Sequence, residues 1–112
     1  CYSPGIMQPQ KTRYVTPLDT NGRRRHEHTR LGKNIIAFCV QIEIFLRGQW
    51  TVVVRYDTAH GYAHQDVCHP DGRIDKTPLF QHTFNDALDY AEYDLRRNWQ
   101  RYLSDFIKEA NE

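Results

Sequence analysis

One alternating stretch, "IIAFCVQIEIFL" at residues 35–46, constrains the fold of this chain more than any other feature. Its apolar side chains recur at every second position, which is the period of a β-strand with one buried face. The residues on the buried face are Phe38, Val40, Ile42, Ile44 and Leu46. Those on the second face are Cys39, Gln41, Glu43 and Phe45. This strand predicts a sheet that another layer covers on one side.

The next stretch, "WTVVVRY" at residues 50–56, has the same period. Its apolar face comprises Trp50, Val52, Val54 and Tyr56, and its second face comprises Thr51, Val53 and Arg55. The segment at residues 47–49 is short enough to be a hairpin turn. A hairpin with Leu46 opposite Trp50 aligns the two apolar faces, and we predict this register.

Two shorter strands are predicted after this hairpin. A tight connection contains Gly61, which suits a positive φ angle. The stretch "YAHQDVCH" at residues 62–69 then returns as a third strand. A Pro-Asp-Gly turn at residues 70–72 follows, and residues 73–80 form a short fourth strand that ends at Pro78.

A long helix is predicted from Phe84 to about Lys108, because apolar residues recur there at spacings of three and four. Thr83 is the expected N-cap, with Asp86 three residues later in the manner of a capping box. The apolar stripe comprises Phe84, Ala87, Leu88, Ala91, Leu95, Trp99, Tyr102, Leu103 and Phe106. Such a helix covers one face of a small antiparallel sheet.

The first third of the chain, residues 1–34, shows neither period. It carries seven Lys or Arg residues against two acidic ones, whereas the remainder is net acidic. We interpret it as an irregular basic arm that can contact nucleic-acid phosphates. The candidate contacts are Arg23, Arg24, Arg25, Arg30 and Lys33. An arm that folds back on the acidic body, binds an acidic partner or stays solvated is also consistent with this composition.

These elements predict an α+β fold, in which residues 35–112 form a small antiparallel sheet of three to four strands with one long C-terminal helix packed on one face. A chain of 112 residues supports one such domain, preceded by the arm. The sequence has no apolar run of about 18 residues, so no membrane span or membrane partner is expected. Three widely spaced cysteines indicate a reducing compartment, and we expect a cytoplasmic protein. Met7 is the expected native start, with residues 1–6 additional to it.

The stretch "RYDTAHGYAHQD", residues 55–66, is rich in titratable groups. If the third strand buries Ala63 and Val67, then its histidine and aspartate point away from the helix. The expected register sets Asp57 opposite Tyr62. It also sets Arg55 opposite His64. The predicted result is an exposed polar cluster of Glu43, Arg55, Asp57, His64 and Asp66, with His60 in the loop above it.

This cluster suits metal-independent cleavage of RNA. A pair of histidines can act as general acid and base, and an arginine can hold a phosphate with two parallel hydrogen bonds. An aspartate can orient a histidine, and a tyrosine can stack on a base. The candidate catalytic residues are His60, His64, Arg55, Asp57, Tyr56 and Asp66.

A purely structural interpretation accounts for the same residues. Charged side chains are expected on the open face of an antiparallel sheet, and Arg–Asp pairs across strands are ordinary. The histidines lack a metal-ligand spacing and no CxxC motif is present, so we predict neither a metal nor a cofactor. Cys39, within a strand, is expected to be a small buried residue rather than a nucleophile.

The stretch "VVVRYDTAHGYAHQDVCHPDG", followed by "TFNDALDYAEYDLRRNWQRY", resembles a group of small prokaryotic proteins with an Arg-Tyr-Asp-x-x-His-Gly hairpin and a long helix. This pattern is distantly similar to the TumE-like toxins of toxin–antitoxin systems. The resemblance covers about residues 36–108 and implies action on RNA and a cognate antitoxin as partner. The matching positions are Arg55, Tyr56, Asp57, His60, His64 and Asp66. This chain departs from the toxin pattern because it lacks a dense histidine run after the turn.

The strands followed by "TFNDALDYA" are also similar to HicB-like antitoxins, in which a sheet and helix bind a toxin without catalysis. The usual glycine-rich second strand is absent here. We therefore expect an RNA-acting, toxin-like protein, with a non-enzymatic binding module as the alternative. A homodimer through the second sheet face is a further expectation, because Phe45, Val53 and Tyr62 would otherwise be exposed there.

Overall fold

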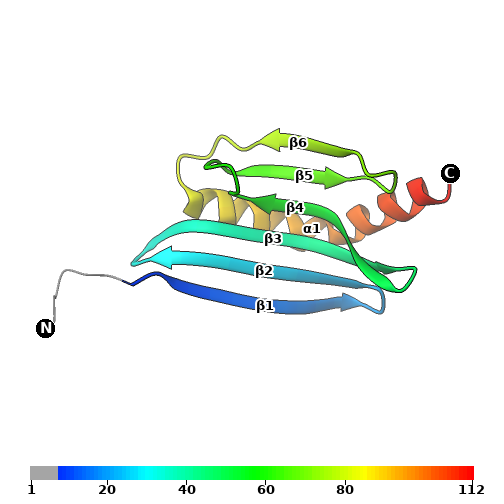
Figure 1. The fold of residues 1–112 in the computed structure, drawn as a ribbon, viewed down its shortest axis with the longest axis horizontal. Coiled ribbons are helices and arrows are strands. Elements are labelled where there is room, and N and C mark those ends of the chain that lie inside the picture. Colours follow the sequence, from blue (N-terminus) through cyan, green and yellow to red (C-terminus); the bar gives the residue numbers. More distant parts are fainter. Residues whose placement is uncertain (1–7) are drawn as a thin grey trace, which may run out of the picture.

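The computed structural model describes residues 8–112, so Cys1 and the expected start at Met7 lie outside the described residues. These residues form one antiparallel sheet of six strands in sequence order, with a single helix packed on it (Figure 1). The strands are β1 (Gln10–Asp19), β2 (Gly22–Leu31), β3 (Asn34–Leu46), β4 (Gln49–Asp57), β5 (His64–Cys68) and β6 (Ile74–Pro78), and the helix is α1 (Phe84–Ala110). The predicted α+β class, with a C-terminal helix on an antiparallel sheet, is confirmed.

The prediction of three to four strands was wrong, because the arm that we expected to be irregular forms β1 and β2. Their polar sequences hide them: β2, "GRRRHEHTRL", contains one large apolar residue, Leu31. The strands are held by backbone pairing to β3 and by ion pairs across the sheet, such as Lys11 with Glu27 at 3.1 Å. Pairing of this kind leaves no apolar period for sequence reasoning to find.

The helix begins and packs as the apolar stripe predicted. The Thr83 hydroxyl accepts a hydrogen bond from the backbone N–H of Asp86 at 3.0 Å, which satisfies one of the free donors of the first turn. The stripe lies against β3 and β4, and its fully buried members are Ala87, Leu88, Ala91, Leu95, Leu103 and Phe106. The helix ends at Ala110, two residues beyond the expected end. No helix in residues 8–112 is long and apolar enough to cross a membrane.

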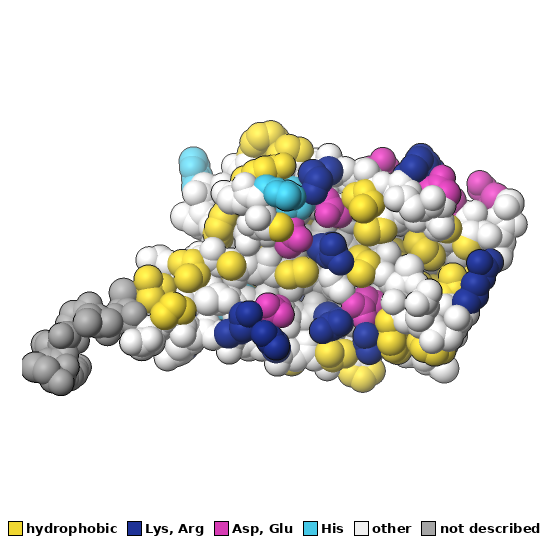
Figure 2. Space-filling model, in the orientation of Figure 1, with side chains coloured by type: hydrophobic (Ala, Val, Ile, Leu, Met, Phe, Trp, Pro, Cys, Tyr) yellow, Lys and Arg dark blue, Asp and Glu magenta, His cyan; other side chains and the backbone are white. Residues whose placement is uncertain are grey.

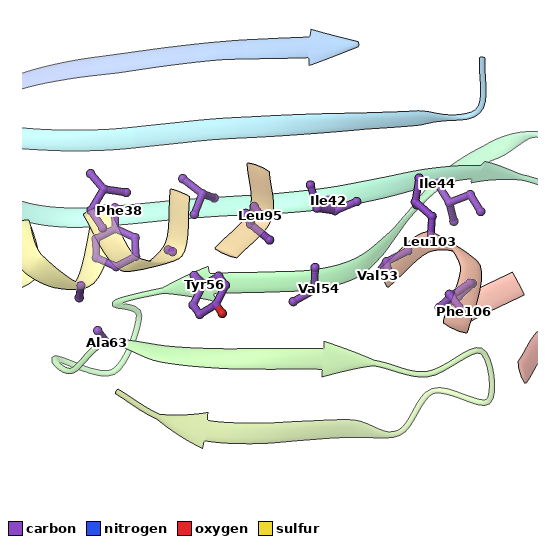
Figure 3. Packing of buried hydrophobic residues seen from close by; sticks show 14 residues of the cluster. Phe38, Ile42, Ile44, Val53, Val54, Tyr56, Ala63, Leu95, Leu103 and Phe106 are labelled. Atoms are coloured by element: carbon purple, nitrogen blue, oxygen red, sulfur yellow. The ribbon is translucent and has the colours of Figure 1, made fainter. Parts of the chain in front are cut away.

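The core is a thin layer between α1 and the central strands. Figure 3 shows Ile42 of β3 and Val54 of β4 pointing toward Leu95 of the helix. All three side chains are almost completely removed from solvent. Each contributes about 1.5–3 kcal/mol of hydrophobic stabilisation, so this layer fixes which face of the sheet the helix covers.

The β3–β4 hairpin differs from the predicted register. Arg47 and Gly48 both have positive φ angles, 53° and 82°, and form a two-residue turn that pairs Leu46 with Gln49. The predicted pairing of Leu46 with Trp50 was therefore wrong. A β-bulge at Val53 restores the register further along, so that the core positions of β3 and β4 still meet.

The bulge changes the faces of the four residues 50–53, of which Val53 and Trp50 matter most. Val53, which alternation assigned to the second face, is buried in the core. Trp50 lies on the second face instead, where the guanidinium of Arg23 stacks over its ring at 4.1 Å. The second face therefore carries an exposed Trp50 rather than Val53 beside Phe45.

Candidate functional site

The side chains of the predicted cluster meet on the sheet face opposite α1, which we call the open face. Glu43 of β3, Arg55 and Asp57 of β4, and His64 and Asp66 of β5 share this face because each lies at an alternate position of its strand. Figure 2 shows the open face, where basic, acidic and histidine side chains gather over the central strands.

The register between β4 and β5 brings two carboxylates to one histidine. Asp57 pairs with His64 and Arg55 pairs with Asp66, two residues away from the predicted register. A shift of two keeps each side chain on its predicted face. The His64 Nε2 atom lies 2.7 Å from Asp57 Oδ1 and 3.7 Å from Asp66 Oδ1.

The cluster is more enclosed than predicted. His64 is only 1% exposed and Asp66 6%, although none of the elements in the described part of the chain forms a layer over this face. The loop at residues 58–63 provides the cover: the rings of His60 and Tyr62 lie 5.9 Å and 5.3 Å from the His64 ring. The expectation of an exposed cluster was wrong for these two residues and for Glu43, which is 3% exposed. His60 itself is exposed, at the rim of the site.

Arg55 continues the cluster toward β3. Its Nε donates a hydrogen bond to Gln41 Oε1 at 2.9 Å, and the Gln41 amide donates to Glu43. Glu43 is in turn paired with Arg23, at 2.5 Å. Within residues 8–112, Arg55 forms no ion pair, although it is half-buried. Its terminal nitrogens therefore keep unsatisfied donor capacity beside the two aspartates.

Tyr56 does not join the site. It lies on the opposite face of β4, where its hydroxyl donates to Asp94 of the helix at 2.6 Å. The Tyr102 hydroxyl donates to the same carboxylate at 2.6 Å, and Gln65 donates to Tyr56 at 3.0 Å. Burial, and then the hydrogen bond to Asp94, raise the pKa of Tyr56 far above its usual range. This residue stabilises the sheet–helix interface and is removed from the candidate catalytic set.

The five basic residues of the former arm do not form one surface. Arg23 and Arg25 lie on the open face and pair with Glu43, at 2.5 and 3.8 Å. Arg24 lies on the helix side, opposite the core residue Ile42. At the far end of the sheet, Arg30 donates to the Gln10 side chain and Lys33 lies in the β2–β3 turn. Strand alternation therefore separates residues that are neighbours in sequence.

A shallow groove of about 440 Å³ runs beside the cluster on the open face. Side chains of β1, β2 and β3 line it, among them Arg13, Arg25, Glu27, Cys39 and Gln41. Sequence reasoning missed Arg13, because the strand that carries it was not predicted; it placed Gln41 on this face but gave it no role. Burial raises the pKa of the Cys39 thiol to about 11, so it stays a neutral thiol at pH 7, as expected for a structural residue.

Three donor side chains of the site converge closely enough to hold a metal ion. One ligand atom each from Asp57, His64 and Asp66 lie within 4.8 Å of one another. Their sequence spacing, on two strands and across a loop, resembles no metal motif, and we predicted no metal for that reason. The signal that would have found them is the cross-strand register, which places Asp57 opposite His64 and leaves Asp66 two residues further along the same face.

The comparisons with known proteins identify a family. The model of a family described as a domain of unknown function, DUF7718, matches residues 7–112. The searches of curated proteins and of solved structures each found no match.

Proposed function

The chain belongs to the DUF7718 family, and we propose that it acts on RNA through the open face of its sheet, cleaving the phosphodiester bond without a metal. The observation that carries this proposal is Arg55, a half-buried guanidinium with no ion pair in residues 8–112, next to a histidine and two carboxylates. A planar cation that lacks a carboxylate partner is suited to bind a phosphate.

Proton transfer is assigned to His60. Cleavage by the RNA 2′-hydroxyl requires a base to remove its proton and an acid to protonate the leaving oxygen. His60 is exposed at the rim, whereas His64 lies beneath it and is held by Asp57. We therefore propose that His60 takes the 2′-hydroxyl proton as base and, as the imidazolium so formed, gives a proton to the leaving oxygen, while His64 and Asp57 position the loop that carries it. The sequence analysis expected both histidines to contact the substrate, and this proposal gives that role to His60 alone.

The groove beside the cluster would hold the rest of the strand. Arg13 and Arg25 line it, the first paired with Glu27 at 3.5 Å and the second with Glu43 at 3.8 Å, and their guanidinium groups follow a path that leads toward Arg55. Tyr62, which is exposed above His64, offers a ring for base stacking. Binding by these groups would be strongly salt-dependent and only weakly sequence-specific.

The resemblance to TumE-like toxins supports this proposal and suggests the biological setting. We propose a cytoplasmic prokaryotic protein whose activity a cognate antitoxin controls. A homodimer through the exposed Phe45 and Trp50 of the open face is a further proposal, and it replaces the surface that included Val53.

The test is cleavage of end-labelled, mixed-sequence RNA in EDTA by the wild type and three variants. We expect His60→Ala to lower the rate at least about 100-fold, the lower end for general acid–base catalysis. Arg55→Gln should weaken RNA binding and cleavage together. His82→Ala, which removes an exposed histidine outside the site, is the matched control and should cleave normally. Equal rates for the wild type and His60→Ala would contradict the assignment.

A non-enzymatic RNA-binding module is the second candidate, and the burial of His64 favours it. Both ring nitrogens of His64 are engaged within the protein, so this residue does not face a substrate directly. In that case RNA would bind with a steep salt dependence and no product would form. Arg55→Gln would then weaken binding and His60→Ala would leave it unchanged, and the lack of any product from the wild type separates this candidate from the first.

A further inference from the structure

We propose that Asp57, His64 and Asp66 bind one divalent transition-metal ion. This site goes beyond the proposed action on RNA and does not depend on it. The ligand set is one imidazole nitrogen and two carboxylate oxygens, on adjacent strands of a rigid sheet. Imidazole with carboxylate suits ions such as Mn²⁺ and Zn²⁺.

The distances between the three donors fit a metal site. Ligand atoms that each lie about 2.1 Å from an ion are separated from one another by about 3.0–3.5 Å. The observed separations from His64 Nε2 are 2.7 Å to Asp57 and 3.7 Å to Asp66, which bracket this range. The ligand atoms of the two aspartates lie within 4.8 Å of one another, so an ion would draw these two side chains together.

The contacts of His64 leave Nε2 able to bind a cation in one of the two tautomers of the ring. Its Nδ1 atom faces the backbone carbonyl oxygen of Tyr62 at 3.4 Å, and a carbonyl can only accept. With its hydrogen on Nε2, the ring donates to Asp57 at 2.7 Å; with the hydrogen on Nδ1, the ring donates to the carbonyl, and the lone pair of Nε2 then faces the two carboxylates. A metal ion would join these three acceptors. A carbonyl on the second ring nitrogen is the arrangement that commonly orients metal-binding histidines.

Asp66 supplies an independent observation. Its side chain is more than nine-tenths buried, and its Oδ1 atom, directed at the site, accepts no hydrogen bond. A buried carboxylate oxygen without a hydrogen bond costs free energy unless a cation is close. Lys76 of β6 places its Nζ atom 3.2 Å from this oxygen, without hydrogen-bond geometry. This partly exposed ammonium can turn to solvent, so we expect it to compete with the metal ion.

The test is calorimetric titration of the full chain, freed of metal with EDTA, with MnCl₂ and separately with ZnCl₂. We expect one binding event per chain. Asp66→Asn keeps the shape of the side chain but removes its charge, and it should weaken affinity at least tenfold. Glu109→Gln removes a carboxylate beside another histidine, His69, and should leave this event unchanged. Circular dichroism melts would show that the variants fold.

Lys76→Gln makes the test sharper, because it should strengthen metal binding several-fold if the ammonium competes for Asp66. Lack of saturable binding of both ions at millimolar concentration would overturn the proposal. Equal affinity of the wild type and the folded Asp66→Asn variant would also overturn it. RNA cleavage is measured separately in EDTA, so metal binding without EDTA-resistant cleavage would support this site while contradicting the proposed function.

Discussion

Two buried histidines, one on each face of the sheet, allow a comparison within the molecule. His26 of β2 lies on the helix side and is 4% exposed, and His64 of β5 lies on the open face and is 1% exposed. Each has a carboxylate oxygen at close range, Glu92 at 2.9 Å from His26 and Asp57 at 2.7 Å from His64. By residue type, burial and nearest partner, the two are nearly equivalent.

Their surroundings differ in charge. The ring of His26 stacks on Tyr14 at 4.5 Å, and its Nε2 lies 2.6 Å from the Nδ1 of His28. Burial lowers the pKa of His26, and the nearby positive groups act in the same direction against Glu92. His64 instead meets two carboxylates. The number of carboxylates around a buried histidine, more than its burial, therefore distinguishes a structural histidine from a candidate metal ligand.

The largest expected effect is on stability at His64. We expect His64→Ala to lower the free energy of unfolding by about 3 kcal/mol, because it leaves two largely buried carboxylates without their shared partner. Urea denaturation at pH 7 would measure the change. A loss below about 1 kcal/mol would show that Lys76 or solvent already compensates both aspartates, and the two histidines would then be alike in energetic terms.

A moderate effect is expected on the pH dependence through His26. Its pKa is lower in the folded chain than the unfolded value of about 6.5, so the unfolded state binds the proton more readily. Stability from this residue is present above that value and is lost as the pH falls below it, by at most about 1.4 kcal/mol per pH unit.

Urea denaturation between pH 7.5 and 5.5 would measure this loss in the wild type and in His26→Phe. The variant keeps an aromatic ring on Tyr14 and removes the titrating group, so its stability should change less with pH. If the free energy of unfolding changed equally with pH in both proteins, groups other than His26 would be titrating in this range. The contrast between His26 and His64 would then not be one of charge.

The smallest effect on stability is expected at His69, because most of its neighbours are side chains on the protein surface. A hydrogen bond to Asp75, and then one to Glu109, raise its pKa. The contribution of His69 to stability is therefore complete below its unfolded pKa of about 6.5, and it is lost as the pH rises through the pKa of the folded state.

His69→Gln should lower stability by less than about 1 kcal/mol, and more at pH 6 than at pH 8. The pH dependence of this contribution is opposite in direction to that of His26. Urea unfolding of the wild type and His69→Gln at both pH values would measure it. A larger loss at pH 8 would contradict the assigned pairs.

The elements with an apolar period could be predicted from the sequence, and the polar ones could not. The stripe of α1 and the buried face of β3 follow from spacing alone, because burial selects those residues. The strand β2 turns Arg24, His26 and His28 toward the helix side, and a polar alternation of this kind is not distinguishable from a loop. Its register is a property of pairing with β3 rather than of its own side chains.

Most members of the candidate site were predictable, but Tyr56 was wrongly included, Arg13 was missed, and the geometry was not predictable. Alternation correctly assigned Arg55, Asp57, His64 and Asp66 to one face, because a two-residue error in register leaves faces unchanged. The distances depend on the length of the loop at residues 58–63, which no local pattern determines. The burial of His64 also depends on that loop. Because the loop length could not be predicted, the convergence of the two carboxylates on the His64 ring could not be predicted either.

The order of the strands has a consequence for how the chain folds. Each strand pairs with the one before it in the sequence, so the whole sheet can grow by adding hairpins, each closing a short segment. The helix that covers Val40, Ile42 and Val54 comes after all six strands. During synthesis the sheet can therefore be complete while its apolar face is still bare. This stage, before the residues of α1 become available, is when the nascent chain is most exposed to aggregation and to chaperones.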